Sequence, residues 1–138
     1  MNERTEWTAI IAEDDALIAD DLKHELERNG VRVLARARSA DEAVEAVRTY
    51  RPGIVILDID LAGGSSGLMA AEAIRQQFDQ GCIFLSGRLD AVTRQQVNGL
   101  EPLAVLSKPL LTSQLLDVIT NHRMRFEPSV TARGDDGA

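Results

Sequence analysis

The stretch Pro52-Gly53-Ile54-Val55-Ile56-Leu57-Asp58 places an unbroken apolar run between a Pro-Gly helix breaker and a carboxylate. A short apolar run with such boundaries is typical of a strand buried on both faces in a parallel sheet. Three other segments repeat the pattern and also end in polar residues. They are Ile10-Ile11-Ala12 before Glu13-Asp14-Asp15, Cys82-Ile83-Phe84-Leu85 before Ser86, and Leu103-Ala104-Val105-Leu106 before Ser107-Lys108-Pro109.

Helical patterns separate these strands along the whole chain. Residues 16–29 carry apolar side chains at a spacing of four and end at Asn29-Gly30, while Ser39 to Glu42 has the form of a capping box that opens a second helix. Further helices are predicted after the glycine-rich loop Leu61–Gly67, within 89–100, and after a cap at Thr112 or Ser113. The second strand, Val31–Ala37, alternates with arginines and is predicted at an edge.

Strict alternation of strands and helices predicts an α/β fold, a doubly wound, flavodoxin-like sheet. We expect five parallel strands in the order 2-1-3-4-5 and five helices, with right-handed crossovers. The fourth strand is expected to begin at Gly81 and the fifth to span Leu103–Leu106. One domain over residues 6–126 is predicted, followed by a disordered tail over 127–138.

Composition excludes several classes of protein. The longest apolar runs fall short of the roughly 20 residues that span a bilayer, and Met1-Asn2-Glu3-Arg4 does not begin a secretory signal. The single cysteine, Cys82, lies within a predicted buried strand, so we expect an inert thiol and a cytoplasmic protein. A net charge of −7 argues against nucleic acid as a partner.

The polar strand ends are the candidate site. Parallel strands direct their carboxyl ends to one edge of the sheet, so the acidic pair, Asp58, Ser86 and Lys108 are expected to meet there. Each feature alone has an ordinary explanation, such as a solvated first helical turn for Glu13 to Asp15. Together they are the groups needed to bind Mg²⁺ and a phosphoryl group, because a carboxylate can accept phosphorus while a metal and a lysine neutralise charge.

With these residues the chain resembles a response-regulator receiver domain, over roughly Thr8 to Arg125. The resemblance implies that Asp58 is the phosphoacceptor and that Ser86 and Lys108 contact the phosphoryl group. It implies Mg²⁺ held by Glu13, Asp14, Asp58 and the backbone carbonyl of Asp60, with Asp14 the more direct ligand of the acidic pair. It also implies a histidine kinase or a histidine phosphotransfer protein as partner, with a downstream protein target as a further candidate.

The chain departs from the family pattern at two places. Val105 stands where the family usually has an aromatic switch residue, and Gly87-Arg88 follows the switch hydroxyl where alanine is usual. Phe84-Leu85-Ser86-Gly87 resembles a receiver subgroup that reads Phe-Ala-Thr-Gly there and lacks that aromatic. Asp60 and Arg88 each lie two residues beyond a site residue, and we expect them to border the site and tune the lifetime of the phosphoryl group.

We expect no output domain and action through protein contacts, as a shuttle, a phosphate sink or a target-binding regulator. Catalysis is expected only of the chain's own phosphorylation and dephosphorylation. Two alternatives are a phosphorylation-independent pseudo-receiver and a phosphatase of the haloacid-dehalogenase type. The phosphatase is disfavoured because that family places its second acidic pair after the lysine, whereas here the acids precede Asp58.

Overall fold

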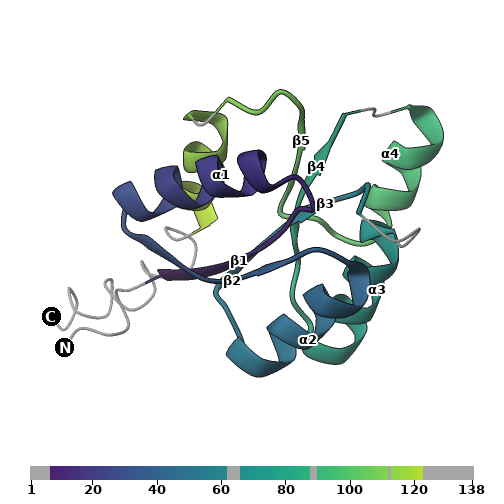
Figure 1. Ribbon diagram of the computed structural model, residues 1–138. Coiled ribbons are helices and arrows are strands. Elements are labelled where there is room, and N and C mark those ends of the chain that lie inside the picture. Colours follow the sequence, from purple (N-terminus) through teal and green to yellow (C-terminus); the bar gives the residue numbers. More distant parts are fainter. Residues whose placement is uncertain (1–6, 62–65, 88–89, 112, 123–138) are drawn as a thin grey trace, which may run out of the picture.

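A computed structural model describes residues 7–61, 66–87, 90–111 and 113–122 (Figure 1). Strands and helices alternate along the chain as the apolar runs predict. The strands are β1 (Trp7–Ala12), β2 (Val31–Ala37), β3 (Ile54–Asp58), β4 (Ile83–Ser86) and β5 (Ala104–Ser107). The helices are α1 (Ala16–Arg28), α2 (Ala40–Tyr50), α3 (Gly67–Phe78), α4 (Ala91–Asn98) and a C-terminal helix over 113–122.

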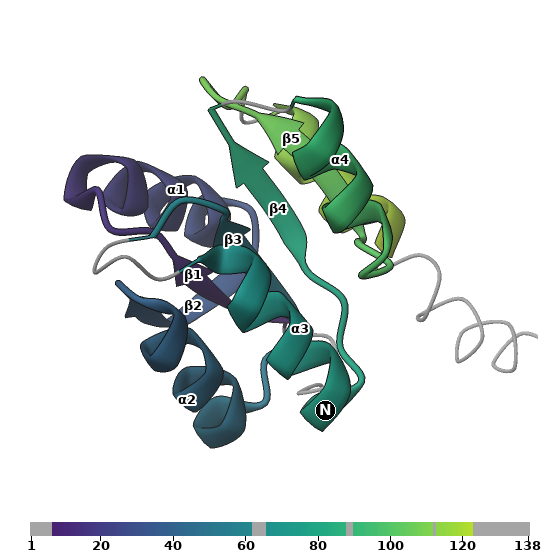
Figure 2. The same cartoon turned by 90° about the vertical axis from the view of Figure 1, so that its right-hand side faces the viewer.

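The five strands form one parallel sheet in the order β2-β1-β3-β4-β5, which confirms the predicted topology. Helix α1 and the C-terminal helix cover one face, and α2, α3 and α4 cover the other (Figures 1 and 2). Each face therefore has its own apolar core. Leu26 and Leu115 belong to the core under α1, whereas Val47 and Ile74 belong to the core under α2 and α3.

Burial explains the strand order. Every residue of β3 is buried, as its unbroken apolar run predicts for a central strand covered on both faces. The arginine-bearing β2 lies at one edge, where long side chains can reach solvent, and the partly exposed β5 lies at the other. The polar residues that follow the strands consequently gather along one rim of a rigid sheet.

Strand β2 is less regular than its sequence suggests. Simple alternation would place Arg32 and Arg36 on the same face of the sheet. The pairing with β1 instead shifts at a bulge, because Ala9 pairs with Val33 but the next residue, Ile10, pairs with Ala35. Arg32 and Arg36 therefore lie on opposite faces.

Several predicted boundaries are wrong by one or two residues. Strand β4 begins at Ile83 rather than Gly81, and α4 is a short helix of 8 residues. The capping box at Ser39 is only half formed: Ser39 accepts the amide of Glu42, but the Glu42 carboxylate accepts the amide of Arg38 rather than that of Ser39. Thr112 and the predicted tail over 127–138 lie outside the described residues.

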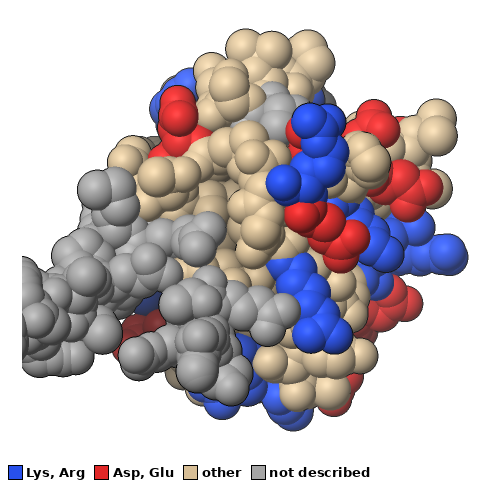
Figure 3. All heavy atoms as spheres, turned by 90° about the vertical axis from the view of Figure 1, so that its left-hand side faces the viewer, with Lys and Arg blue, Asp and Glu red and all other residues tan. Residues whose placement is uncertain are grey.

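The exposed surface carries charges of both signs. On the face drawn in Figure 3, basic and acidic side chains alternate rather than separate into large patches. Among the helices whose placement is described, none combines the length and apolar character needed to cross a membrane.

Candidate functional site

Four strand ends supply the candidate site residues. Glu13 directly follows β1, Asp58 closes β3, Ser86 closes β4, and Lys108 directly follows β5. Backbone hydrogen bonds between neighbouring strands continue past these ends, from the Ile59 amide to the Leu85 carbonyl at 2.9 Å and from the Lys108 amide to the Ser86 carbonyl at 2.8 Å. The rim is therefore held by the same ladder that holds the sheet.

Lys108 joins two buried carboxylates. Its Nζ donates to Asp58 Oδ2 at 2.9 Å and lies 3.1 Å from Glu13 Oε1 in an ion pair. The carboxylate side chains are only 3% and 1% exposed, whereas that of Lys108 is 24% exposed. Burial of this kind is unfavourable for a lone charge, so the ammonium is what makes two adjacent buried carboxylates tolerable.

The pKa values express this balance. Burial raises the pKa of Glu13 above its usual value, and the nearby Asp58 charge adds to the rise, although hydrogen bonds from the Asp15 amide and Lys108 oppose it. For Lys108, burial lowers the pKa, but the hydrogen bonds to Asp58 and Glu13 outweigh it and the net pKa is raised. Lys108 is therefore firmly positively charged at neutral pH.

Three carboxylates converge in the site. Glu13, Asp14 and Asp58 each offer an oxygen, and these oxygens lie within 4.8 Å of one another. Glu13 and Asp58 are buried while Asp14 is exposed, so the group opens to solvent on the Asp14 side. Glu13 Oε1 is fully buried, and among the described residues its polar partner is the Lys108 ammonium, 3.1 Å away. An all-oxygen set with an incompletely satisfied buried acceptor fits a hard divalent cation such as Mg²⁺.

Two neighbouring acidic residues, Asp15 and Asp60, do not belong to this group of three carboxylates. Asp15 is the N-cap of α1, where its Oδ1 accepts the amides of Leu17 and Ile18. The ordinary explanation of the acidic run, a helix start, is thus correct for Asp15. Asp60 is exposed, and its amide donates to Asp58 Oδ1 at 3.0 Å, so Asp58 is hydrogen-bonded through both oxygens.

Helix α3 packs closely against the backbone of β3 at Asp58 and Ile59. The Gly67 amide donates to the Ile59 carbonyl at 2.8 Å. A Cβ on Gly67 would overlap the Asp58 carbonyl oxygen and lie 2.8 Å from Ile59 Cα. Only glycine permits this contact. The glycine-rich loop before the helix is visible in the sequence, but the pattern does not show which glycine touches the site.

Arg36 is a second residue that sequence reasoning missed. Its guanidinium donates from Nε to the Glu13 carbonyl at 3.0 Å and from Nη2 to the Asp14 carbonyl at 2.9 Å. The only signal in the sequence was an arginine near the end of an edge strand, three residues before the capping Ser39.

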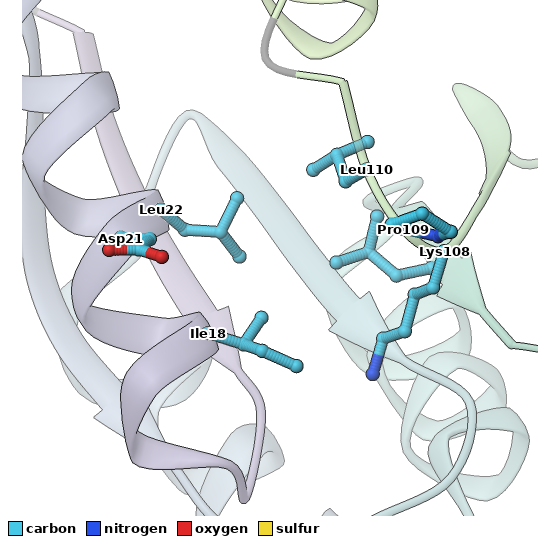
Figure 4. A pocket seen from close by; sticks show the side chains of 7 residues that line it. Ile18, Asp21, Leu22, Lys108, Pro109 and Leu110 are labelled. Carbon is cyan, nitrogen blue, oxygen red and sulfur yellow. The ribbon is translucent and has the colours of Figure 1, made fainter.

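A pocket of about 270 Å³ borders the site between α1 and the segment after β5 (Figure 4). Ile18 and Leu22 point into it from α1, opposite Pro109 and Leu110, and the Lys108 stem forms part of its wall. The lining is mostly apolar and leaves out Glu13, Asp14 and Asp58. The polar centre therefore lies beside this pocket rather than inside it.

The remaining predicted residues have mixed outcomes. Ser86 is buried at the end of β4, next to the strand that carries Asp58. Val105 is a partly buried residue of β5 that packs on the core under α2 and α3. Arg88 lies outside the described residues, so the expectation that it borders the site with Asp60 and tunes the lifetime of the phosphoryl group stays a prediction.

Fold and site together define a flavodoxin-like α/β domain with an acidic centre and a lysine at the carboxyl ends of its parallel strands. The family model for the response regulator receiver domain matches residues 9–120. The chain therefore belongs to the receiver-domain family of response regulators.

Relatives and solved structures agree with this assignment. The chain is 36% identical over 125 residues to the phyllosphere-induced regulator PhyR of Methylorubrum extorquens. This alignment covers 90% of this chain and 46% of PhyR. It is 30% identical over 128 residues to the transcriptional regulatory protein PdtaR of Mycobacterium tuberculosis, covering 91% of this chain and 61% of PdtaR. The chain thus spans about half the length of these curated relatives.

Among solved structures, the signal receiver domain of a modulated diguanylate cyclase from Desulfovibrio desulfuricans G20 superposes with a TM-score of 0.79 at 29% identity, covering 88% of this chain and 98% of that one. A CheY-like receiver domain protein from Methanospirillum hungatei JF-1 superposes with the same TM-score of 0.79 at 22% identity, covering 89% of this chain and 98% of that one; this second match supports the fold alone.

Proposed function

We propose that this chain is a phosphoacceptor response regulator of a two-component or phosphorelay system, phosphorylated on Asp58 with the help of Mg²⁺. One observation carries the proposal: Lys108 joins the buried carboxylates of Asp58 and Glu13, with Asp14 open to solvent beside them. A purely structural ion pair would not need a third carboxylate at its exposed side.

In the proposed reaction a carboxylate oxygen of Asp58 attacks the phosphorus of a donor. A new oxygen–phosphorus bond forms while the bond from phosphorus to the donor breaks, and the donor leaves with that electron pair. The donor is the phosphohistidine imidazole of a histidine kinase or a phosphotransfer protein. The product is an aspartyl phosphate, an acyl phosphate that water can later hydrolyse.

The chain's residues position and neutralise this centre. The Asp60 amide and Lys108 hold the two oxygens of Asp58 in place before the reaction. Lys108 would then move its contact from Asp58 to a phosphoryl oxygen, and Ser86, which closes the neighbouring strand, would contact another. Glu13, Asp14, Asp58 and the Asp60 carbonyl would hold Mg²⁺. When bound, Mg²⁺ neutralises charge that develops on the phosphoryl oxygens.

The activity of the whole protein is proposed on the same basis. The chain catalyses only its own phosphorylation and dephosphorylation, acts in the cytoplasm, and passes its signal through protein contacts with a kinase, a phosphotransfer protein or a downstream target.

The test is phosphorylation by a small-molecule donor. Incubation with acetyl phosphate and Mg²⁺ should add one phosphoryl group, seen as an increase in intact mass that is lost at alkaline pH. Asp58→Asn should abolish this increase, and chelation of Mg²⁺ should prevent it. Phosphorylation of Asp58→Asn at the parent rate would contradict the proposal.

A further inference from the structure

Arg36 binds the backbone of both members of the acidic pair. Its Nε donates to the Glu13 carbonyl at 3.0 Å and its Nη2 to the Asp14 carbonyl at 2.9 Å. A guanidinium carries its donors in a rigid planar fork, so two such bonds fix the relative position of two successive carbonyl groups. The contact is made to the backbone, which leaves both carboxylates available for other ligands.

The β2 bulge is what directs Arg36 to this place. Beyond the bulge Arg36 pairs with Ile11, whose side chain lies in the core under α1. Without the extra residue Arg36 would pair with Ala12 and point to the α2 and α3 face instead. Bulges commonly redirect a side chain beside a functional site, and here the redirected side chain reaches the loop that joins β1 to α1.

This loop has a specific structural problem. It must hold Glu13 and Asp14 beside Asp58 although the three carboxylates repel one another. Two of its amide groups are also held: the Glu13 amide donates to the Ala37 carbonyl at 2.9 Å, and the Asp15 amide donates to Glu13 Oε2 at 3.1 Å. These bonds hold amide groups of the loop, whereas the two bonds from Arg36 hold the carbonyl groups of Glu13 and Asp14.

We propose that Arg36 is a positioning residue for the metal site, which holds the Glu13–Asp14 backbone in the conformation that binds Mg²⁺. The inference rests on the proposed function for the identity of the metal. The hydrogen-bonding fork of Arg36, rather than its charge, is the active feature. The positive charge of Arg36 by itself would repel a cation bound at Glu13 and Asp14.

This distinction sets the choice of variants. Arg36→Lys keeps the charge but loses the two-pronged geometry, and Arg36→Gln loses both. Arg38→Gln is the matched control, because Arg38 is exposed near the same end of β2 and the variant removes the same charge while leaving both bonds of Arg36 intact. Each protein is titrated with MgCl₂ and followed by amide chemical shifts, and hydrogen exchange of the Glu13 and Asp15 amides is measured without metal.

A positioning role predicts that Arg36→Lys and Arg36→Gln both raise the Kd for Mg²⁺ by about tenfold, as is typical when a partner behind a metal ligand is lost. The Glu13 and Asp15 amides should exchange faster in both variants, and Arg38→Gln should match the parent. Parental Mg²⁺ affinity in Arg36→Lys, or tighter Mg²⁺ binding in Arg36→Gln, would overturn the proposal. Unchanged amide exchange in the two variants would overturn it as well. A parent that binds no Mg²⁺ would instead overturn the proposed function, and the amide exchange, measured without metal, would still test the positioning role.

Discussion

At the residue scale, the pairing of Lys108 with Glu13 and Asp58 connects metal binding to phosphorylation. The site holds a buried glutamate whose pKa is raised chiefly by burial, next to a lysine that is paired with it and with Asp58. A cation that enters between the carboxylates would take over part of the role of Lys108. Lys108 would then be free to contact the incoming phosphoryl group, so metal binding and phosphorylation should be linked.

Asp14 is the residue whose loss should separate the acidic site from the ion pair. Asp14→Asn removes the exposed carboxylate and leaves Lys108 with both of its buried partners. We expect the Kd for Mg²⁺ to rise at least about tenfold, equivalent to about 1.4 kcal/mol, and phosphorylation by acetyl phosphate to slow in parallel. Calorimetric titration measures the first quantity and intact mass the second.

Asp20→Asn is the control for this experiment, since Asp20 is exposed on α1 and carries the same charge. It should behave like the parent protein. Undiminished Mg²⁺ affinity in Asp14→Asn would show that Asp14 is not a ligand.

At the scale of elements, α3 approaches the end of β3 so closely at Gly67 that no Cβ fits between them. Gly67→Ala would force the added Cβ against the Asp58 carbonyl and Ile59 Cα. We expect a loss of about 1–3 kcal/mol in the free energy of unfolding, as for other overpacked sites, together with slower phosphorylation because Asp58 moves with its backbone. Urea unfolding and the rate of acetyl phosphate labelling report the two effects.

Gly99→Ala provides the comparison. Gly99 has a φ of −69° and an added Cβ would meet its nearest neighbour at 3.6 Å, an ordinary contact. This variant should be neutral or stabilising by up to about 1 kcal/mol. If Gly67→Ala were equally well tolerated, the packing of α3 on Asp58 would be looser than described.

The elements were largely predictable because local pattern and long-range packing agree. The run Ile54–Leu57 is apolar throughout, and it forms the strand that is buried on both faces. The convergence of Glu13, Asp58 and Lys108 follows from the parallel sheet and could also be predicted. The bulge in β2 could not, since Arg32 and Arg36 fit regular alternation and only the pairing with β1 reveals the shift.

The contacts of the loops were also beyond sequence pattern. Arg36 and Gly67 act on backbone groups distant in sequence, so they leave no periodic signal. The sequence also does not show that Glu13 is buried while Asp15 caps the helix. Any residue of an acidic run before a helix could be the cap.

At the scale of the whole molecule, the buried Cys82 links stability to pH. Burial raises the pKa of its thiol from 9.0 to about 12. Above pH 9 the unfolded chain releases this proton while the folded chain retains it, so folding stability falls as pH rises. We expect the parent to lose about 1.4 kcal/mol more than Cys82→Ala between pH 8 and pH 10, measured by urea unfolding. Identical pH profiles for the two proteins would contradict the burial of a neutral thiol.

Location of the phosphoryl group tests the central claim most directly. The protein is incubated with acetyl phosphate and Mg²⁺, reduced with borohydride to convert an aspartyl phosphate to homoserine, and digested for peptide mass mapping. The proposal predicts homoserine at position 58 and unmodified Asp14 and Asp60. Homoserine at another position, or a phosphorylated protein in which residue 58 stays aspartate, would contradict it.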